Sequence, residues 1–147
     1  MKLRPYSATF LTVGGILLMG LGLYFVFLRP PLLPEDPRYM GSSLSEIQAV
    51  LPGLLLWLRR VFWVMGGYMS ATGLLTVYVA LTSFRARAKG AVAVVAVVGL
   101  ASIAWMVAVN FIIASDFKWL LLAFALPWVI ALVLYGTEQK GDVKHTG

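Results

Sequence analysis

Four long apolar stretches, almost free of charge, make up most of this chain. They occupy residues 6–28, 61–84, 91–113 and 117–134. Each holds about 18–24 residues, so as a helix rising about 1.5 Å per residue it crosses a hydrocarbon core about 30 Å thick. We therefore expect an all-α integral membrane protein built as a four-helix bundle.

Composition supports one membrane domain over residues 1–147. The 147 residues are 61% hydrophobic and 12% charged, whereas a soluble domain carries about 25% charged residues. The chain contains no cysteine, which excludes disulfides, thiolate catalysis and cysteine-ligated metal centres. The net charge of +6 fits basic residues that flank membrane spans, so we expect no nucleic-acid partner.

The distribution of basic residues predicts the orientation. The short loop between the second and third stretches holds Arg85, Arg87 and Lys89 and no acid, and short basic loops stay on the cytoplasmic side. An even number of spans places both termini on the same side as this loop. We therefore predict a multi-pass protein of the plasma (inner) membrane with cytoplasmic termini, an uncleaved first span and a polar, disordered tail at residues 136–147.

The first outer segment, residues 29–52, begins with RPPLLPEDPRYMG. Its four prolines favour extended or turn geometry. Further on, Ser43 and Glu46 have the spacing of a capping box, which predicts a short helix at residues 44–51. The apolar side chains of this helix share one face, so we expect it to lie along the membrane surface.

The second apolar stretch contains a run of small residues, GGYMSATG. Small residues four apart on a membrane helix allow a neighbouring backbone to approach closely. We predict helix packing through Gly66, Gly67, Ser70, Ala71 and Gly73.

Charged residues gather on the predicted outer side. We consider Arg59, Arg60, Glu35 and Asp36 as a site for an anionic headgroup or ligand. The further members of this set are Arg38, Glu46, Asp116 and Lys118. The alternative interpretation is interfacial anchoring together with weak, exposed ion pairs.

The apolar stretches carry little reactive chemistry. None has an ionisable residue well inside it, which argues against a proton-coupled pump. The only histidine, His145, lies in the tail, so we expect no metal site and no cofactor. Asn110 is expected to hydrogen-bond a neighbouring helix. An enzyme, which we leave uncertain but disfavour, would need Glu35, Asp36 and Asp116 to converge on a pocket.

The chain resembles a known protein family in its four short spans and in two segments, LRPPLLPEDPRYMG and GGYMSATG. It resembles the small, uncharacterised DoxX-like four-helix bacterial membrane proteins. The resemblance implies a plasma-membrane four-helix bundle and almost nothing about activity. The four-span small multidrug transporters match less well, because residues 6–28 lack the acid of their first span.

Two functions remain open. The first is a non-enzymatic protein that acts by helix–helix association, as a homo-oligomer or an accessory subunit of a membrane complex, through the face between Gly66 and Gly73. Its partners would be membrane lipid and either itself or another membrane protein. The alternative is a protein that binds or transports a lipid or small apolar molecule in a cavity between the spans. That cavity would open beneath Arg59 and Arg60 and be gated by residues 29–52.

Overall fold

The computed structural model describes residues 6–144, with side chains described as far as Gln139. Within this range the chain is helical, without strands. The elements are α1 (Tyr6–Phe27), α2 (Glu35–Met40), α3 (Leu44–Val50), α4 (Leu54–Val79), the π-helix η1 (Ala80–Phe84), α5 (Ala91–Gly99), the π-helix η2 (Leu100–Ala104), α6 (Trp105–Ile112) and α7 (Lys118–Lys144). This confirms the predicted all-α class.

Four helical segments are long and apolar enough to cross a membrane. They are Tyr6–Phe27, Leu54–Phe84, Ala91–Ile112 and Lys118–Gln139. The second segment begins at Leu54, seven residues before the predicted residue 61, because the apolar lead-in continues the same helix. Its 31 residues span about 46 Å at about 1.5 Å per residue, which exceeds a hydrocarbon core.

Helices α1 and α4 pack with their backbones nearly in contact. A Cβ atom added at Gly66 would lie 2.5 Å from the carbonyl oxygen of Gly22, and one at Gly73 would lie 2.5 Å from the backbone nitrogen of Met19. A Cβ at Gly15 would lie 2.9 Å from the carbonyl oxygen of Gly73. Glycines seven residues apart on each helix therefore form one continuous contact.

The small residues of α4 divide between two faces. Gly66 and Gly73 are buried, and the hydroxyl of Ser70 donates to the carbonyl oxygen of Met19 at 3.4 Å. Gly67 and Ala71 are exposed, and a Cβ at Gly67 would meet no described atom within 4 Å. Part of the predicted packing face thus lies inside the molecule, against α1.

Trp128 holds α7 against the other helices. Its side chain is 3% exposed, and its Nε1–H donates to the carbonyl oxygen of Val95 on α5 at 3.0 Å. Gly99 provides the space, because a Cβ there would lie 2.5 Å from Trp128 Nε1. On α1, a Cβ at Gly14 would be in ordinary contact with the indole, at 3.5 Å.

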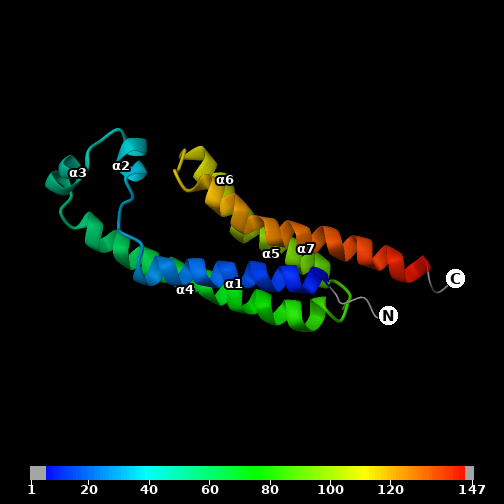
Figure 1. Cartoon of the computed structure of the whole chain (residues 1–147). Helices are drawn as coiled ribbons and strands as arrows, with labels where there is room; N and C mark the ends of the chain where they lie inside the picture. Colours follow the sequence, from blue (N-terminus) through cyan, green and yellow to red (C-terminus); the bar gives the residue numbers. More distant parts are fainter. Residues whose placement is uncertain (1–5, 145–147) are drawn as a thin grey trace.

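Figure 1 shows the resulting shape. Helix α1 runs beside α4, and α5 and α6 run beside α7. The two pairs lie together at the end that carries the termini and separate toward the opposite end, where α2 and α3 are found. Side chains from all four long helices form the core. Because these helices contact one another mainly in the half where the two pairs meet, most of the core lies there.

Two local predictions are wrong. Residues 136–144 are helical rather than disordered, because α7 continues to Lys144; His145 lies outside the described residues. In the proline-rich segment, residues 29–34 are non-helical as predicted, but residues 35–40 form the short helix α2 with Pro37 inside it. Proline is tolerated there because the first turn of a helix has no internal partner for its N–H groups.

The predicted capping box is confirmed. The Ser43 hydroxyl accepts from the backbone nitrogen of Glu46 at 3.2 Å, and the Glu46 carboxylate accepts from the backbone nitrogen of Ser43 at 2.8 Å. These two bonds start α3, which has no buried residue.

Candidate functional site

A cavity of about 1290 Å³ lies between the two helix pairs, in the half of the molecule away from the termini. Its wall consists of the second half of α1, the middle of α4 (residues 61–72), residues 102–113 and the start of α7. Leu33, from the segment after α1, also contributes. The cavity therefore occupies the space that opens where the pairs diverge.

The cavity exists because the close contacts lie elsewhere. Glycines hold α1 against α4, and Trp128 holds α7 against α1 and α5 on the side of the termini. Gly20, by contrast, lines the cavity, and a Cβ there would meet no atom of the described chain within 4 Å. No side chain of the described part fills the space in front of this glycine.

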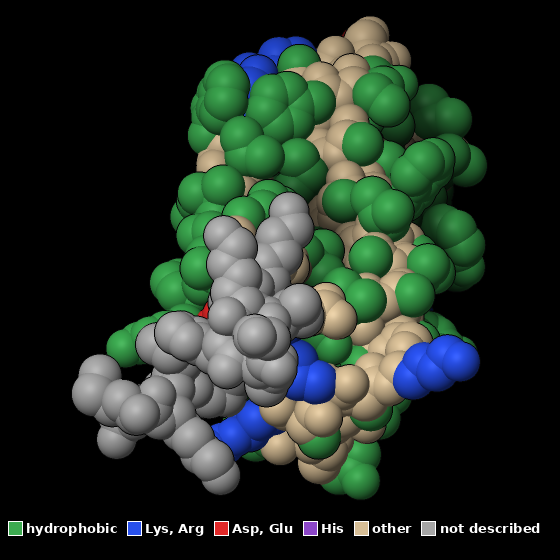
Figure 2. Space-filling model, turned by 90° about the vertical axis from the view of Figure 1, so that its right-hand side faces the viewer, with side chains coloured by type: hydrophobic (Ala, Val, Ile, Leu, Met, Phe, Trp, Pro, Cys, Tyr) green, Lys and Arg blue, Asp and Glu red, His purple; other side chains and the backbone are tan. Residues whose placement is uncertain are grey.

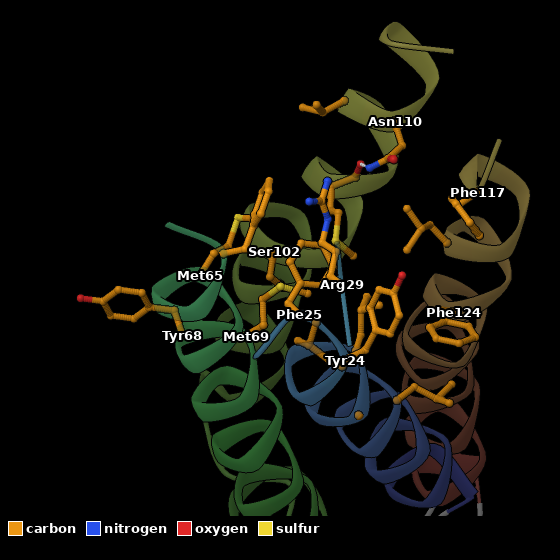
Figure 3. Close-up of a pocket in the computed structure, with 18 of the residues that line it drawn as sticks. Tyr24, Phe25, Arg29, Met65, Tyr68, Met69, Ser102, Asn110, Phe117 and Phe124 are labelled. Carbon is orange, nitrogen blue, oxygen red and sulfur yellow. Dashed lines mark hydrogen bonds between the residues drawn. The ribbon is translucent and has the colours of Figure 1, made fainter. Parts of the chain in front are cut away.

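Most of the lining is apolar, with many aromatic and methionine side chains (Figure 3). These side chains are Phe25, Phe62, Met65, Met69, Trp105, Met106, Phe117 and Phe124. Methionine is flexible and polarisable, so it adapts to ligands of irregular shape. Such a lining suits a largely apolar molecule.

The most distinctive polar group of the wall is Arg29. Its side chain is 9% exposed, and the guanidinium lies over the Phe62 ring, 3.6 Å from the centroid. Its Nη2 is 3.5 Å from Oδ2 of Asp36, and its Nη1 donates to the carbonyl oxygen of Pro30 at 2.9 Å. Its Nε is buried and has no hydrogen-bond partner among the described residues. Nε is therefore an unpaired donor with almost no accessible surface.

Burial and nearby charge act on Arg29 in opposite directions. Desolvation lowers the pKa of Arg29, whereas the carboxylates of Asp36 and Glu35 raise it. An arginine stays protonated in such surroundings. The side chain is therefore a fixed cation next to two acids.

Glu35 joins α2 to the turn between α6 and α7. It is 2% exposed, and its Oε1 accepts from the Ser115 hydroxyl at 3.0 Å. A second, exposed contact lies beside it, since Nη2 of Arg38 is 3.1 Å from both carboxylate oxygens of Asp116. These two contacts join α2 to the α6–α7 turn at the distal end of the molecule.

The structure separates the predicted headgroup site. Asp36 pairs with the cavity arginine Arg29, and Glu35 lies nearby. Arg59 and Arg60 are exposed and are not part of the cavity wall as described. The Arg60 guanidinium lies 4.2 Å from the Trp63 ring centroid, a cation–π contact suited to an interface.

Sequence reasoning missed Arg29, which was not among the candidate residues for the headgroup site. Two signals could have identified it. Arg29 directly follows an apolar stretch, and the acids Glu35 and Asp36 come within seven residues after a proline-directed bend. Together these place opposite charges close to the end of a span.

None of the three carboxylates that an enzyme would need is among the residues that line the cavity. Glu35 bonds to Ser115, Asp36 to Arg29, and Asp116 to Arg38. No group of three or more acidic or histidine side chains that could hold a metal ion occurs in the described part of the chain.

Asn110 was predicted to bond across helices, and this is wrong. Its Nδ2 donates to the carbonyl oxygen of Met106 in its own helix, at 2.9 Å. Its side chain lines the cavity, as do those of Tyr24, Tyr68 and Ser102. The cavity wall therefore carries scattered hydrogen-bonding groups in addition to Arg29.

A second polar group joins the helices at the end with the termini. Nη2 of Arg87 lies 2.6 Å from Oε2 of Glu138, and the Ser7 hydroxyl donates to the same oxygen at 2.7 Å. The Arg87 guanidinium also lies 4.3 Å from the Tyr135 ring centroid. This group ties α1 and α7 to the basic loop; Figure 2, seen from this end, shows basic side chains here.

No protein-family model, curated protein or solved structure matches the chain. The resemblance to DoxX-like proteins therefore stays a prediction, and functional inference depends on the site itself.

Proposed function

We propose that this is a multi-pass plasma-membrane protein that binds a lipid or small apolar molecule between its four spans. The termini face the cytoplasm in this proposal, so the cavity lies in the outer half of the membrane. The observation that carries it is the apolar cavity of about 1290 Å³ with a buried arginine at its wall.

The size and chemistry of the cavity support an apolar occupant. Several of its lining side chains, among them Tyr68 and Trp105, are well exposed, so the space opens toward the surroundings and an apolar chain can enter it from the side. Ligand pockets usually measure about 300–1,000 Å³, so this one accommodates a molecule of lipid size.

The segment after α1 is placed to act as a cover. It contributes Leu33 and Arg29 to the wall, and α2 is attached to the α6–α7 turn by Glu35 and Arg38. These contacts support a cover over the distal end, and in this proposal their release admits a ligand from the outer side.

Native mass spectrometry of protein released gently from its own membrane tests the proposal. The wild type should retain a small molecule or lipid. Gly20→Phe should lose it, because the ring would project into the cavity. Gly136→Phe is the matched control, since Gly136 also has no described atom within 4 Å of an added Cβ and does not line the cavity. No retained molecule in the wild type, or equal retention in Gly20→Phe, would refute the proposal.

Association is a second candidate, favoured by one observation. Gly67 and Ala71 form a small-residue pair on the exposed face of α4, and such pairs support close helix contacts between membrane proteins. Replacing either residue with leucine should break a homo-oligomer and leave membrane insertion intact. Unchanged migration in mild detergent would remove this face from consideration.

A further inference from the structure

We infer that the ligand is a bilayer lipid of the outer leaflet, one acyl chain of which enters the cavity sideways between α4 and α6 while the head stays at the membrane surface. This inference rests on the proposed function, and it adds the class of ligand and the route by which the cavity is filled from the membrane.

The cavity has a side opening, marked by residues that line it and are nevertheless exposed. Tyr68 on α4 is 73% exposed and Trp105 on α6 is 68% exposed, although both belong to the cavity wall. Helix α4 packs on α1 and α6 packs on α7, so these two residues come from different helix pairs. Figure 3 shows the Tyr68 ring pointing away from the other labelled side chains. Both residues lie inside spans, where the surroundings are lipid tails, so the opening faces the acyl chains of the bilayer.

The length of the cavity matches one leaflet. Its wall uses residues 61–72 of α4 and residues 102–113 of the third span, and each stretch reaches about 17 Å at about 1.5 Å per residue. Half of a hydrocarbon core of about 30 Å measures about 15 Å. The cavity therefore has the length of an extended acyl chain in one leaflet.

The depth of the cavity places it in the outer half of the membrane. Its inner end lies at Thr72 and Ser102, which are 12 residues from Phe84 and 11 residues from Ala91, the inner ends of the two spans. These separations correspond to about 17 Å of helix, so the inner end lies near the middle of the bilayer. The cavity thus runs from the outer surface to the midplane, as an acyl chain of the outer leaflet does.

The polarity of the wall decreases toward this inner end. The hydroxyls of Thr72 and Ser102 donate to carbonyl oxygens one turn earlier in their own helices, at 2.8 and 2.6 Å. These donors are satisfied locally, so the inner end presents mainly hydrocarbon to a ligand. The polar lining residues Arg29 and Asn110 lie at the outer end. The gradient has the same direction as that of an outer-leaflet lipid, whose ester groups lie above its tail.

The bilayer also favours this occupant energetically. A tail that moves from the bilayer into the cavity exchanges lipid neighbours for side chains that are equally apolar, so the transfer costs little. The side chains of the wall gain dispersion contacts that an unfilled space would not provide. Because acyl chains surround the side opening at high concentration, they can fill the cavity at modest intrinsic affinity.

The test uses two photoreactive phosphatidylcholines in nanodiscs that contain the full chain. The tail probe carries a diazirine near the end of one acyl chain, and the head probe carries it next to the choline. Peptide mass spectrometry then locates the adducts. The tail probe should label Met69 and Phe124, which line the cavity and are only partly exposed, and the head probe should label neither. Leu100, which is exposed and outside the cavity wall, reports surrounding lipid and should react with the tail probe in every variant.

A label at the side opening connects these adducts to the route. The chain has no cysteine, so a single introduced cysteine can be modified selectively after folding. Met65→Cys, at an exposed position of the cavity wall, is coupled to N-cyclohexylmaleimide in detergent. The label should lower tail-probe adducts at Met69 and Phe124 about tenfold, which corresponds to a loss of about 1.4 kcal/mol. Unlabelled Met65→Cys should keep the wild-type pattern, as should labelled Leu75→Cys, the matched control on an exposed residue of the same helix outside the cavity wall.

The outcomes separate the inference from the proposed function. Tail-probe adducts confined to outward-facing residues such as Leu100, equal labelling of Met69 and Phe124 by the head probe, or the same adduct yield in both labelled variants would overturn the inference. The proposed function then stands if the wild type still retains a molecule that Gly20→Phe loses. Absence of such a molecule would overturn the proposed function and, with it, the inference.

Discussion

Replacing Gly73 with alanine should separate α1 from α4. The added Cβ would lie 2.5 Å from the backbone nitrogen of Met19, 2.6 Å from the carbonyl oxygen of Gly15 and 2.9 Å from the Met19 Cα. All three are backbone atoms, so no side-chain rotation relieves the overlap. The helices would have to move about 0.9 Å apart, since ordinary van der Waals contact begins at 3.4 Å.

The expected cost follows from overpacking, which typically destabilises a protein by about 1–3 kcal/mol. Gly67→Ala is the matched control, because it lies on the same helix and its Cβ meets no described atom within 4 Å. Alanine is favoured over glycine inside a helix by roughly 0.5–1 kcal/mol. The control should therefore be neutral or slightly more stable than the wild type.

Unfolding in mixed micelles of mild detergent and dodecyl sulfate, followed by tryptophan fluorescence, measures both variants. Gly73→Ala should unfold at a lower dodecyl sulfate fraction than the wild type. Shortening Met19 to alanine should not rescue it, because the overlap involves the Met19 backbone. Equal stability of Gly73→Ala and Gly67→Ala would show that the close α1–α4 contact is absent.

Two further predictions concern the ends of the molecule. Arg87→Gln should lower the free energy of unfolding by about 1–3 kcal/mol, because it leaves the mostly buried carboxylate of Glu138 without its cation. The control Arg85→Gln, on an exposed residue of the same loop, should change this free energy by less than about 0.5 kcal/mol. Equal shifts of the two variants in the same micelle titration would contradict the ion pair. At α3, hydrogen bonds from the Ser43 backbone and from the hydroxyls of Ser42 and Ser43 lower the pKa of Glu46. The ionised carboxylate therefore stabilises the cap fully above the ordinary carboxyl pKa, and this stabilisation is lost as the pH falls through the lowered pKa. The protection of the α3 amides against hydrogen exchange, taken relative to the intrinsic rate at each pH, should therefore fall below about pH 4 in the wild type. Glu46→Gln, which does not titrate, should remove this fall. The same pH dependence of protection in both proteins would refute the assignment.

Local features were predictable from the sequence. The four long helices follow from uninterrupted apolar stretches, because length and low charge alone set this property. The start of α3 was also predictable, since Ser43 and Glu46 are three residues apart and their hydrogen bonds form within one turn. These properties depend on residues close together in the chain.

Features that join distant segments were not predictable. The bond between Ser7 and Glu138 links positions 131 residues apart, and the pairing of Glu35 with Ser115 requires the outer segment to reach the α6–α7 turn. The contacts of Glu138 also help to explain why the polar end of α7 remains helical. A hydropathy pattern contains no information about contacts between residues far apart in the chain.

The sequence by itself determined that the chain forms four long apolar helices and that small residues lie along α4. Only the tertiary structure decided that Gly66 and Gly73 face α1 while Gly67 faces outward, because adjacent residues point about 100° apart and the neighbouring helix selects the side that becomes buried. The cavity likewise depends on the separation of the helix pairs. A void is the space that several distant segments leave unfilled, so it arises only once all of them are in place.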